Sequence, residues 1–176
     1  AGTACDPKLT PHNLTVSTES PGYDGQFFYR LALDPFSFER TSHGITLDNP
    51  TYRHRRIGYP LVAWALSGGQ PAFVIYTMPI TNLLGLALLG WLGGLFAIFW
   101  GRHAVWGLIL PLYPGFLLSL SRDLSEVLTV LLLIAAYYAL MRGRLLMATI
   151  FLCGGVLTRE TLILVPAILL MIDCIA

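Results

Sequence analysis

A run of 45 residues without a charged side chain, from residue 57 to residue 101, most constrains what this chain can fold into. A single membrane crossing needs about 20 apolar residues, and a soluble domain has about a quarter of its residues charged. Here 12% of the 176 residues are charged and 55% are hydrophobic, and most of the charges lie before residue 57. The sequence therefore predicts a multi-pass membrane protein rather than a soluble globule.

The apolar runs predict the individual helices. Residues 67–71 (SGGQP) break the long run into a piece too short to span, 59–66, and a spanning helix over 73–100. Gly90 and Gly94 in that helix have the G-x-x-x-G spacing that lets helices pack closely. The expected fold class is all-α, a bundle of about four to six membrane helices. The later helices are expected at 104–120, kinked near Pro114, and at 124–141, 145–157 and 161–172.

The segment before the membrane helices is expected to be a polar loop, residues 1–58, followed by a transmembrane region, residues 59–176. Within the loop, a short helix is predicted from Asp24 to Leu33, with an apolar face that suits it to lie on the bilayer surface. The chain lacks an initiating Met and a signal-peptide pattern, and its last apolar run stops at residue 176. We therefore expect an internal piece of a larger membrane protein, incomplete at both ends.

If each run crosses the membrane once, the loops separate by charge. Residues 1–58, 122–126 and 159–160 fall on one side with nine of the ten acids, whereas residues 102–103 and 142–144 carry only Arg and His. This separation suits a polar site at one membrane surface. The positive-inside rule points the other way, because eight of the 11 Lys and Arg residues share the acid-rich side and would place it in the cytoplasm. That rule is weakest for long segments such as residues 1–58.

Asp24 is the first candidate for chemistry. As the residue before a predicted helix, it is a good N-cap, and this is the more common use of such an aspartate. The alternative is a general base held at the bilayer surface among aromatic residues, where it would be a stronger base. The two roles are compatible, since a cap also fixes a carboxylate in place.

Other charged residues have comparable alternatives. Asp123 and Glu126 have capping-box spacing, although an acid one turn into an apolar helix needs a partner. The neighbouring Arg159 and Glu160 are either an interfacial turn or part of a site. A basic cluster just before the membrane either anchors headgroups or captures a phosphate; it consists of Arg53, Arg55 and Arg56. The net charge of +1, without a basic face, does not indicate a nucleic-acid partner.

Four segments in order carry a family resemblance: YDGQFFYRLA at 23–32, YRHRRIGYP at 52–60, SRDLSE at 121–126 and LTRET at 157–161. Taken together, they resemble bacterial multi-pass proteins of cell-surface glycopolymer formation. These proteins are similar to GT-C membrane glycosyltransferases of the lipid-linked mannosyltransferase type. The resemblance implies a hexosyltransferase in the bacterial inner (plasma) membrane, with residues 1–58 outside the cytoplasm. Its partners would be a polyprenyl-phosphate sugar donor, a glycan or lipid acceptor and the bilayer.

The resemblance also implies roles for individual residues. Asp24 occupies the place of the catalytic base in the first extracytoplasmic loop of this family. Basic residues would bind the donor phosphate, with Arg53, Arg55, Arg56, Arg122 and Arg159 as candidates. Acids would bind acceptor hydroxyls or, in metal-using relatives, a divalent cation; these are Asp123, Glu126 and Glu160. The first loop lacks an Asp-x-Asp pair, which leaves metal dependence open. The rival interpretations are a lipid-linked sugar flippase or transporter, and a scaffolding membrane subunit.

Overall fold

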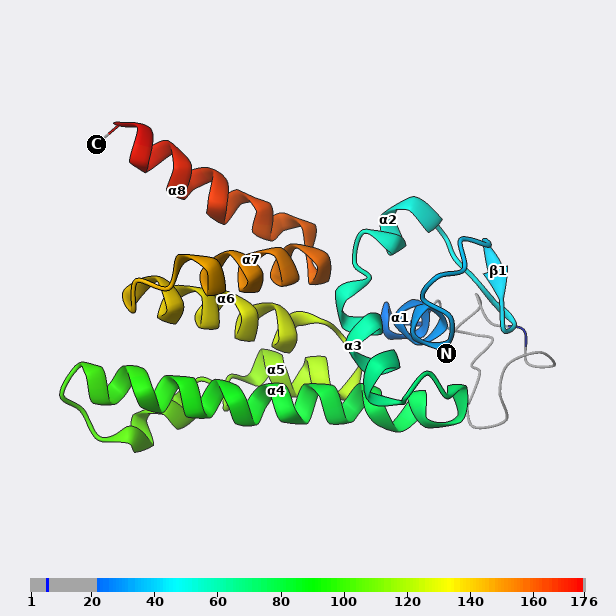
Figure 1. Cartoon of the computed structure of the whole chain (residues 1–176). Helices are drawn as coiled ribbons and strands as arrows, with labels where there is room; N and C mark the ends of the chain where they lie inside the picture. Colours follow the sequence, from blue (N-terminus) through cyan, green and yellow to red (C-terminus); the bar gives the residue numbers. More distant parts are fainter. Residues whose placement is uncertain (1–5, 7–21, 176) are drawn as a thin grey trace.

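The computed structural model describes residue 6 and residues 22–175, and it is mostly helical (Figure 1). The helices, in chain order, are α1 (Gly25–Leu33), α2 (Pro50–His54), α3 (Gly58–Leu66), α4 (Pro71–Phe99), η1 (Ala104–Ile109), α5 (Pro114–Ser121), α6 (Glu126–Met141), α7 (Leu145–Thr158), η2 (Glu160–Ile163) and α8 (Leu164–Ile175). A hairpin of two short strands, β1 (Thr41–Ser42) and β2 (Ile45–Thr46), lies between α1 and α2. The expected all-α fold class is confirmed.

The long helix α4 is the axis of the molecule. It has 29 residues, so it is about 43 Å long at 1.5 Å per residue and exceeds the roughly 30 Å thickness of bilayer hydrocarbon. By length and composition, it is the one described helix able to cross a membrane, whereas α6 and α7 are shorter apolar helices. The multi-pass arrangement therefore stays a prediction. The predicted break before α4 is confirmed, because Gly68 and Gly69 turn the chain with positive φ angles.

The predicted crossing at 104–120 is wrong as a single helix. The chain forms η1 and α5, which are separated by residues 110–113 and return along α4 (Figure 1). Pro114 explains the break, because it has no N–H to donate and takes the first position of α5. The predicted close packing at Gly90 and Gly94 is confirmed. A Cβ on Gly94 would lie 3.2 Å from the Ala104 carbonyl oxygen, so these glycines let η1 pack directly on α4.

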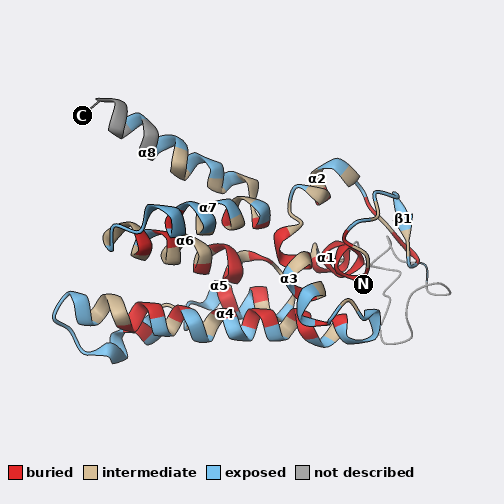
Figure 2. Ribbon diagram, in the orientation of Figure 1, coloured by how far each residue is buried: buried red, intermediate tan, exposed pale blue. Residues whose placement is uncertain are grey.

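The helix α1 differs most from its prediction. It does not present an amphipathic face to a bilayer surface, because all nine of its residues are buried between α3, α4 and the hairpin (Figure 2). On the polar face, the loop that follows α1 supplies acceptors for both Nη atoms of Arg30. The Arg30 guanidinium donates to the Ser37 carbonyl at 3.3 Å and the Glu39 carbonyl at 2.7 Å. Helix α1 thus packs onto α3 and α4, and α2 and the hairpin pack against α1.

Polar side chains join the helices inside the bundle. The Tyr59 hydroxyl of α3 donates to the Met78 carbonyl of α4 at 3.0 Å and accepts from the Asn82 amide at 3.0 Å. Thr129 of α6 donates to the Thr158 hydroxyl of α7 at 2.9 Å. Outside the bundle, large apolar side chains on α4, η1 and α7 are exposed (Figure 2). Such a surface marks contact with a membrane or another protein.

Candidate functional site

Loops far apart in the sequence meet at one end of the bundle. The first turn of α1 packs so closely on the loop between α5 and α6 that a Cβ on Gly25 would overlap the Arg122 carbonyl oxygen. A Cβ on Gly58 would lie 2.8 Å from the Leu157 carbonyl carbon at the end of α7. Arg102 and Arg142 lie at the opposite end, where α4 and α6 finish (Figure 1). The grouping of loops predicted from the spacing of charges is therefore present in the fold.

Asp24 stands immediately before α1, but it does not cap the helix. It has a helical backbone, and its side chain makes no capping hydrogen bond. Its carboxylate instead forms an ion pair with Arg53 at 2.9 Å and lies 3.8 Å from Arg56. The side chain is 43% exposed, so a ligand in solvent can reach it. The predicted N-cap role of the side chain is wrong.

Arg53 is the buried centre of this group, with its side chain 7% exposed. Its guanidinium donates to both carboxylate oxygens of Asp48, at 2.8 and 2.7 Å, and stacks 4.2 Å from the Phe27 ring. The hydrogen bonds from Arg53 lower the pKa of Asp48 to about 2. Asp48 and Asp24 thus hold Arg53 from two sides, and neither oxygen of Asp48 lacks a partner.

Arg56 connects the polar segment to the far end of α7. It donates to Glu160 through Nε at 2.8 Å and Nη2 at 2.7 Å, across 104 residues of sequence. The Arg56 guanidinium also stacks 4.4 Å from the Tyr52 ring. These hydrogen bonds lower the pKa of Glu160 to about 2. The Arg159–Glu160 turn therefore does more than reverse the chain, since it ties η2 to the segment after α2.

The second acid of the predicted capping box has a different partner. Glu126 begins α6 and accepts from Arg159 at 3.0 Å and from the Ser119 hydroxyl at 3.2 Å. Asp123 has a left-handed backbone with φ of 50°, and Ser125 at the cap position makes no capping hydrogen bond. The predicted capping box is therefore wrong. The expectation that an acid in the first turn of α6 needs a partner is met by Arg159.

Asp123 lies in the loop between α5 and α6, and its Oδ1 atom is buried without a hydrogen-bond partner. Burial raises the pKa of this carboxyl to about 6. A carboxyl whose pKa is higher in the folded state destabilises that state once it ionises, so Asp123 opposes folding at neutral and alkaline pH. A carboxyl whose pKa is raised by burial, next to other charged groups, is a feature of sites that bind or react with a ligand.

Replacing Asp123 by asparagine is expected to stabilise the protein at pH 8, by about 1–2 kcal/mol, and to leave stability nearly unchanged below pH 4. The asparagine removes the buried charge and also accepts the left-handed backbone that Asp123 adopts. Thermal unfolding in detergent at both pH values measures the difference. Equal stability of the two proteins at pH 8 would show that the Asp123 charge is solvated.

Arg122 differs from the other arginines at this end. Its guanidinium stacks 4.0 Å from the Tyr23 ring, and within the described residues it forms no ion pair with a carboxylate. Arg53, Arg56 and Arg159 are each paired with an acid. Arg55 is exposed and likewise has no ion pair in the part of the chain that the structure describes. Arg122, stacked on the ring of the residue before Asp24, is therefore an arginine of this end whose charge remains available to a ligand.

Several members of this group were not predicted from the sequence. They are the acid Asp48, the hydroxyl of Ser119 and the rings stacked on arginines, Tyr23, Phe27 and Tyr52. Asp48 lies five residues before Arg53, a separation that brings the two together only because α2 starts between them. The aromatic residues carried a usable signal, because a Tyr or Phe lies within three residues of each of Asp24, Arg53 and Arg56.

The acids of the site do not form a metal-ligand cluster. Among the described residues, no group of three or more His, Cys, Asp or Glu side chains could hold a metal ion. Glu126 and Glu160 already accept from arginines, and Asp123 is separate from both pairs. The arrangement instead offers a reachable carboxylate, Asp24, and an available guanidinium, Arg122. Such a pair can accept a proton and hold an anion at neighbouring positions.

We call this group, comprising Asp24, Asp48, Arg53, Arg56, Arg122, Asp123, Glu126, Arg159 and Glu160, the charged cluster. It lies at the end of an otherwise apolar bundle. Its members come from α2, α6 and η2, from the residues on either side of α2, and from the residues just before α1, α6 and η2. No family model, curated protein or solved structure matches the chain.

Proposed function

We propose that this chain is part of a membrane glycosyltransferase, which transfers a sugar from a polyprenyl-phosphate donor to a glycan or lipid acceptor. The observation that supports this proposal best is the charged cluster, in which Asp24 is 43% exposed beside arginines at the end of an apolar bundle. A lipid-linked donor presents its phosphate at the membrane surface. An enzyme for it needs a base and a cation at that depth, and the cluster offers both, as Asp24 and as Arg122, which is unpaired within the described residues.

The apolar surface supports placing the protein in a membrane. The helix α4 is long enough to cross a membrane, and exposed apolar side chains continue onto α7. Lipid would cover this apolar surface. We propose that α4, the hairpin of η1 and α5, and the helices α6 and α7 all lie within the bilayer. The membrane is then the bacterial plasma membrane, with the charged cluster at its outer surface.

In the proposed reaction, Asp24 acts as the general base. Its carboxylate takes the proton of the acceptor hydroxyl while the hydroxyl oxygen forms a bond to the anomeric carbon of the sugar. The bond between that carbon and the phosphate oxygen breaks, and the polyprenyl phosphate leaves with the electron pair. A single displacement of this kind inverts the anomeric configuration. The ion pair with Arg53 keeps the Asp24 carboxylate in place for this step.

Arg122 is the proposed ligand of the departing phosphate, because its charge is not already neutralised by an acid. Replacing Arg122 by glutamine is expected to raise the KM for the donor by about tenfold to a hundredfold, since a charge-assisted hydrogen bond contributes about 1.5–3 kcal/mol. Steady-state transfer assays on the full-length protein measure this effect. The control is Arg55→Gln, which removes an exposed arginine that lies outside the charged cluster, between α2 and α3. Equal effects of the two substitutions would contradict the assignment of Arg122.

The orientation of the bundle can be tested directly. The ion pairs of Arg53, Arg56 and Arg159 neutralise much of the positive charge that the positive-inside rule counts on the cluster side. We therefore expect that a cysteine at position 121, beside the cluster, reacts with a membrane-impermeant maleimide in intact cells. A cysteine at position 144, at the other end, is expected to react only after lysis. The native cysteines are first replaced by serine, and the reverse labelling pattern would contradict the proposed function.

A further inference from the structure

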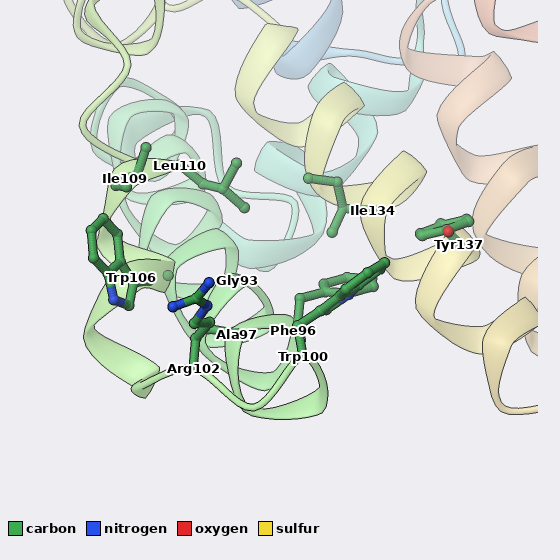
Figure 3. Close-up of a pocket in the computed structure, with 11 residues that line it drawn as sticks. Gly93, Phe96, Ala97, Trp100, Arg102, Trp106, Ile109, Leu110, Ile134 and Tyr137 are labelled. Carbon is green, nitrogen blue, oxygen red and sulfur yellow. The ribbon is translucent and has the colours of Figure 1, made fainter.

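A large pocket lies at the end of the bundle opposite to the charged cluster. It has a volume of about 730 Å³ and is formed by the last turns of α4, by η1 and by α6 (Figure 3). Most of its lining is apolar or aromatic, including Phe96, Trp100, Trp106 and Tyr137. The volume and the apolar lining are those of a site for a small amphiphilic ligand. Because α4 is about 43 Å long, this pocket is far from Asp24.

Arg102 is the charged residue of this pocket. In Figure 3 its side chain lies between Trp106 and Phe96, so the guanidinium is at the pocket and not directed away from it. Arg102 is exposed and forms no ion pair among the described residues. The pocket therefore combines an apolar interior with one cation that has no counter-charge.

The surroundings of the pocket have the same sign of charge. The segments 100–113 and 142–144 at this end contain Arg102, Arg142, Arg144 and His103 but no acid. Arg142 and Arg144 line a neighbouring pocket of about 750 Å³ between α4, α6 and α7, where Arg142 donates to the Tyr138 hydroxyl at 2.9 Å. This end of the molecule therefore attracts an anion, because its arginines have no acid nearby in the sequence. The arginines of the charged cluster, by contrast, mostly form ion pairs with acids.

We propose that the Arg102 pocket binds an anionic phospholipid of the surrounding bilayer. The phosphate would lie against the Arg102 guanidinium, and an acyl chain would occupy the aromatic interior. Basic pockets between membrane helices bind anionic headgroups on the cytoplasmic side, and Trp residues lie at headgroup depth. Trp100 and Trp106 flank Arg102 in the sequence and line the same pocket. This inference rests on the membrane placement of the proposed function but not on sugar transfer.

The test uses the tryptophans of the pocket as reporters. The chain contains four tryptophans, and replacing Trp64 and Trp91 by phenylalanine leaves Trp100 and Trp106 as the fluorescent residues. The protein is reconstituted with phosphatidylglycerol or phosphatidylcholine carrying dibrominated acyl chains, which quench nearby indoles. We expect phosphatidylglycerol to reach half-maximal quenching at about a fivefold lower mole fraction, the preference conferred by one arginine near a membrane surface.

Three further variants distinguish a specific site from general electrostatic attraction. Arg102→Gln is expected to abolish the preference for phosphatidylglycerol and Arg102→Lys to retain most of it. Arg144→Gln, which removes an equal charge from the same end but outside this pocket, should leave the preference intact. Equal quenching by both lipids in the protein that keeps Arg102 and Arg144 would overturn the inference. So would an equal loss of the preference for phosphatidylglycerol in Arg102→Gln and Arg144→Gln. Since the assay contains no sugar donor, its outcome is independent of whether the protein transfers a sugar.

Discussion

Replacing Asp24 by asparagine is expected to lower the rate of sugar transfer by about 10²- to 10⁴-fold, which is the contribution of a general base. The substitution keeps the size of the side chain and removes its ability to accept a proton. Because Asp24 is 43% exposed and is not needed as a helix cap, we expect the variant to fold and insert normally. The rate is measured as release of polyprenyl phosphate from the donor by the full-length protein.

The matched control is Asp48→Asn. Asp24 and Asp48 are both paired with Arg53, and their side chains are 43% and 53% exposed, so the two substitutions disturb the same arginine. Asp48 uses both carboxylate oxygens to hold Arg53 and is not proposed to touch the acceptor. We expect Asp48→Asn to reduce transfer less than tenfold. A similar loss in both variants would mean that Asp24 acts through Arg53 and is not the base.

The second large effect is expected on stability, from the bond between Arg56 and Glu160. Glu160→Gln is expected to cost about 2 kcal/mol of unfolding free energy at pH 7, because it removes the partner of a guanidinium whose side chain is only 12% exposed. The comparison is Glu126→Gln, in which the pair with Arg159 is 35–38% exposed and has one charged hydrogen bond. For Glu126→Gln we expect a loss of unfolding free energy of about 1 kcal/mol or less. Unfolding in detergent measures both.

The same pair predicts a dependence on pH. The pKa of Glu160 is lowered to about 2 in the folded state from 4.5, so the stabilisation is complete above pH 4.5 and is lost as the pH falls toward 2. The difference in stability between the native protein and Glu160→Gln should therefore shrink over this range. A difference that stays constant from pH 7 to pH 2 would show that the glutamate acts by packing rather than by its charge.

Much of the helical framework is predictable, because long apolar runs and their breaks have only a few physical solutions. The ends of α4, α6 and α7 lie within two residues of their predicted positions. Two predictions failed. Helix α1 is buried by tertiary contacts with α3 and α4, and backbone carbonyls beyond its end accept from the Nη atoms of Arg30. Residues 104–120 do not form one helix, because Pro114 starts a new one after η1.

The sequence predicted which charged residues belong to the candidate site better than it predicted which of them form ion pairs. The spacing of charges was enough to bring Asp24, Arg122 and Glu160 to one end of the bundle. Which acid neutralises which arginine depends on contacts such as Arg56 to Glu160, 104 residues apart, and no local pattern encodes them. The distinction between Arg122 and the paired arginines, on which the phosphate assignment depends, could only come from the folded arrangement.

The most direct test of the proposed function is to supply the reconstituted full-length protein with a polyprenyl-phosphate sugar and an acceptor glycan extract, and to analyse the products by NMR. We predict release of polyprenyl phosphate together with a new glycosidic bond of inverted anomeric configuration. Movement of the intact donor across the bilayer without release of polyprenyl phosphate would contradict the proposal and indicate a transporter.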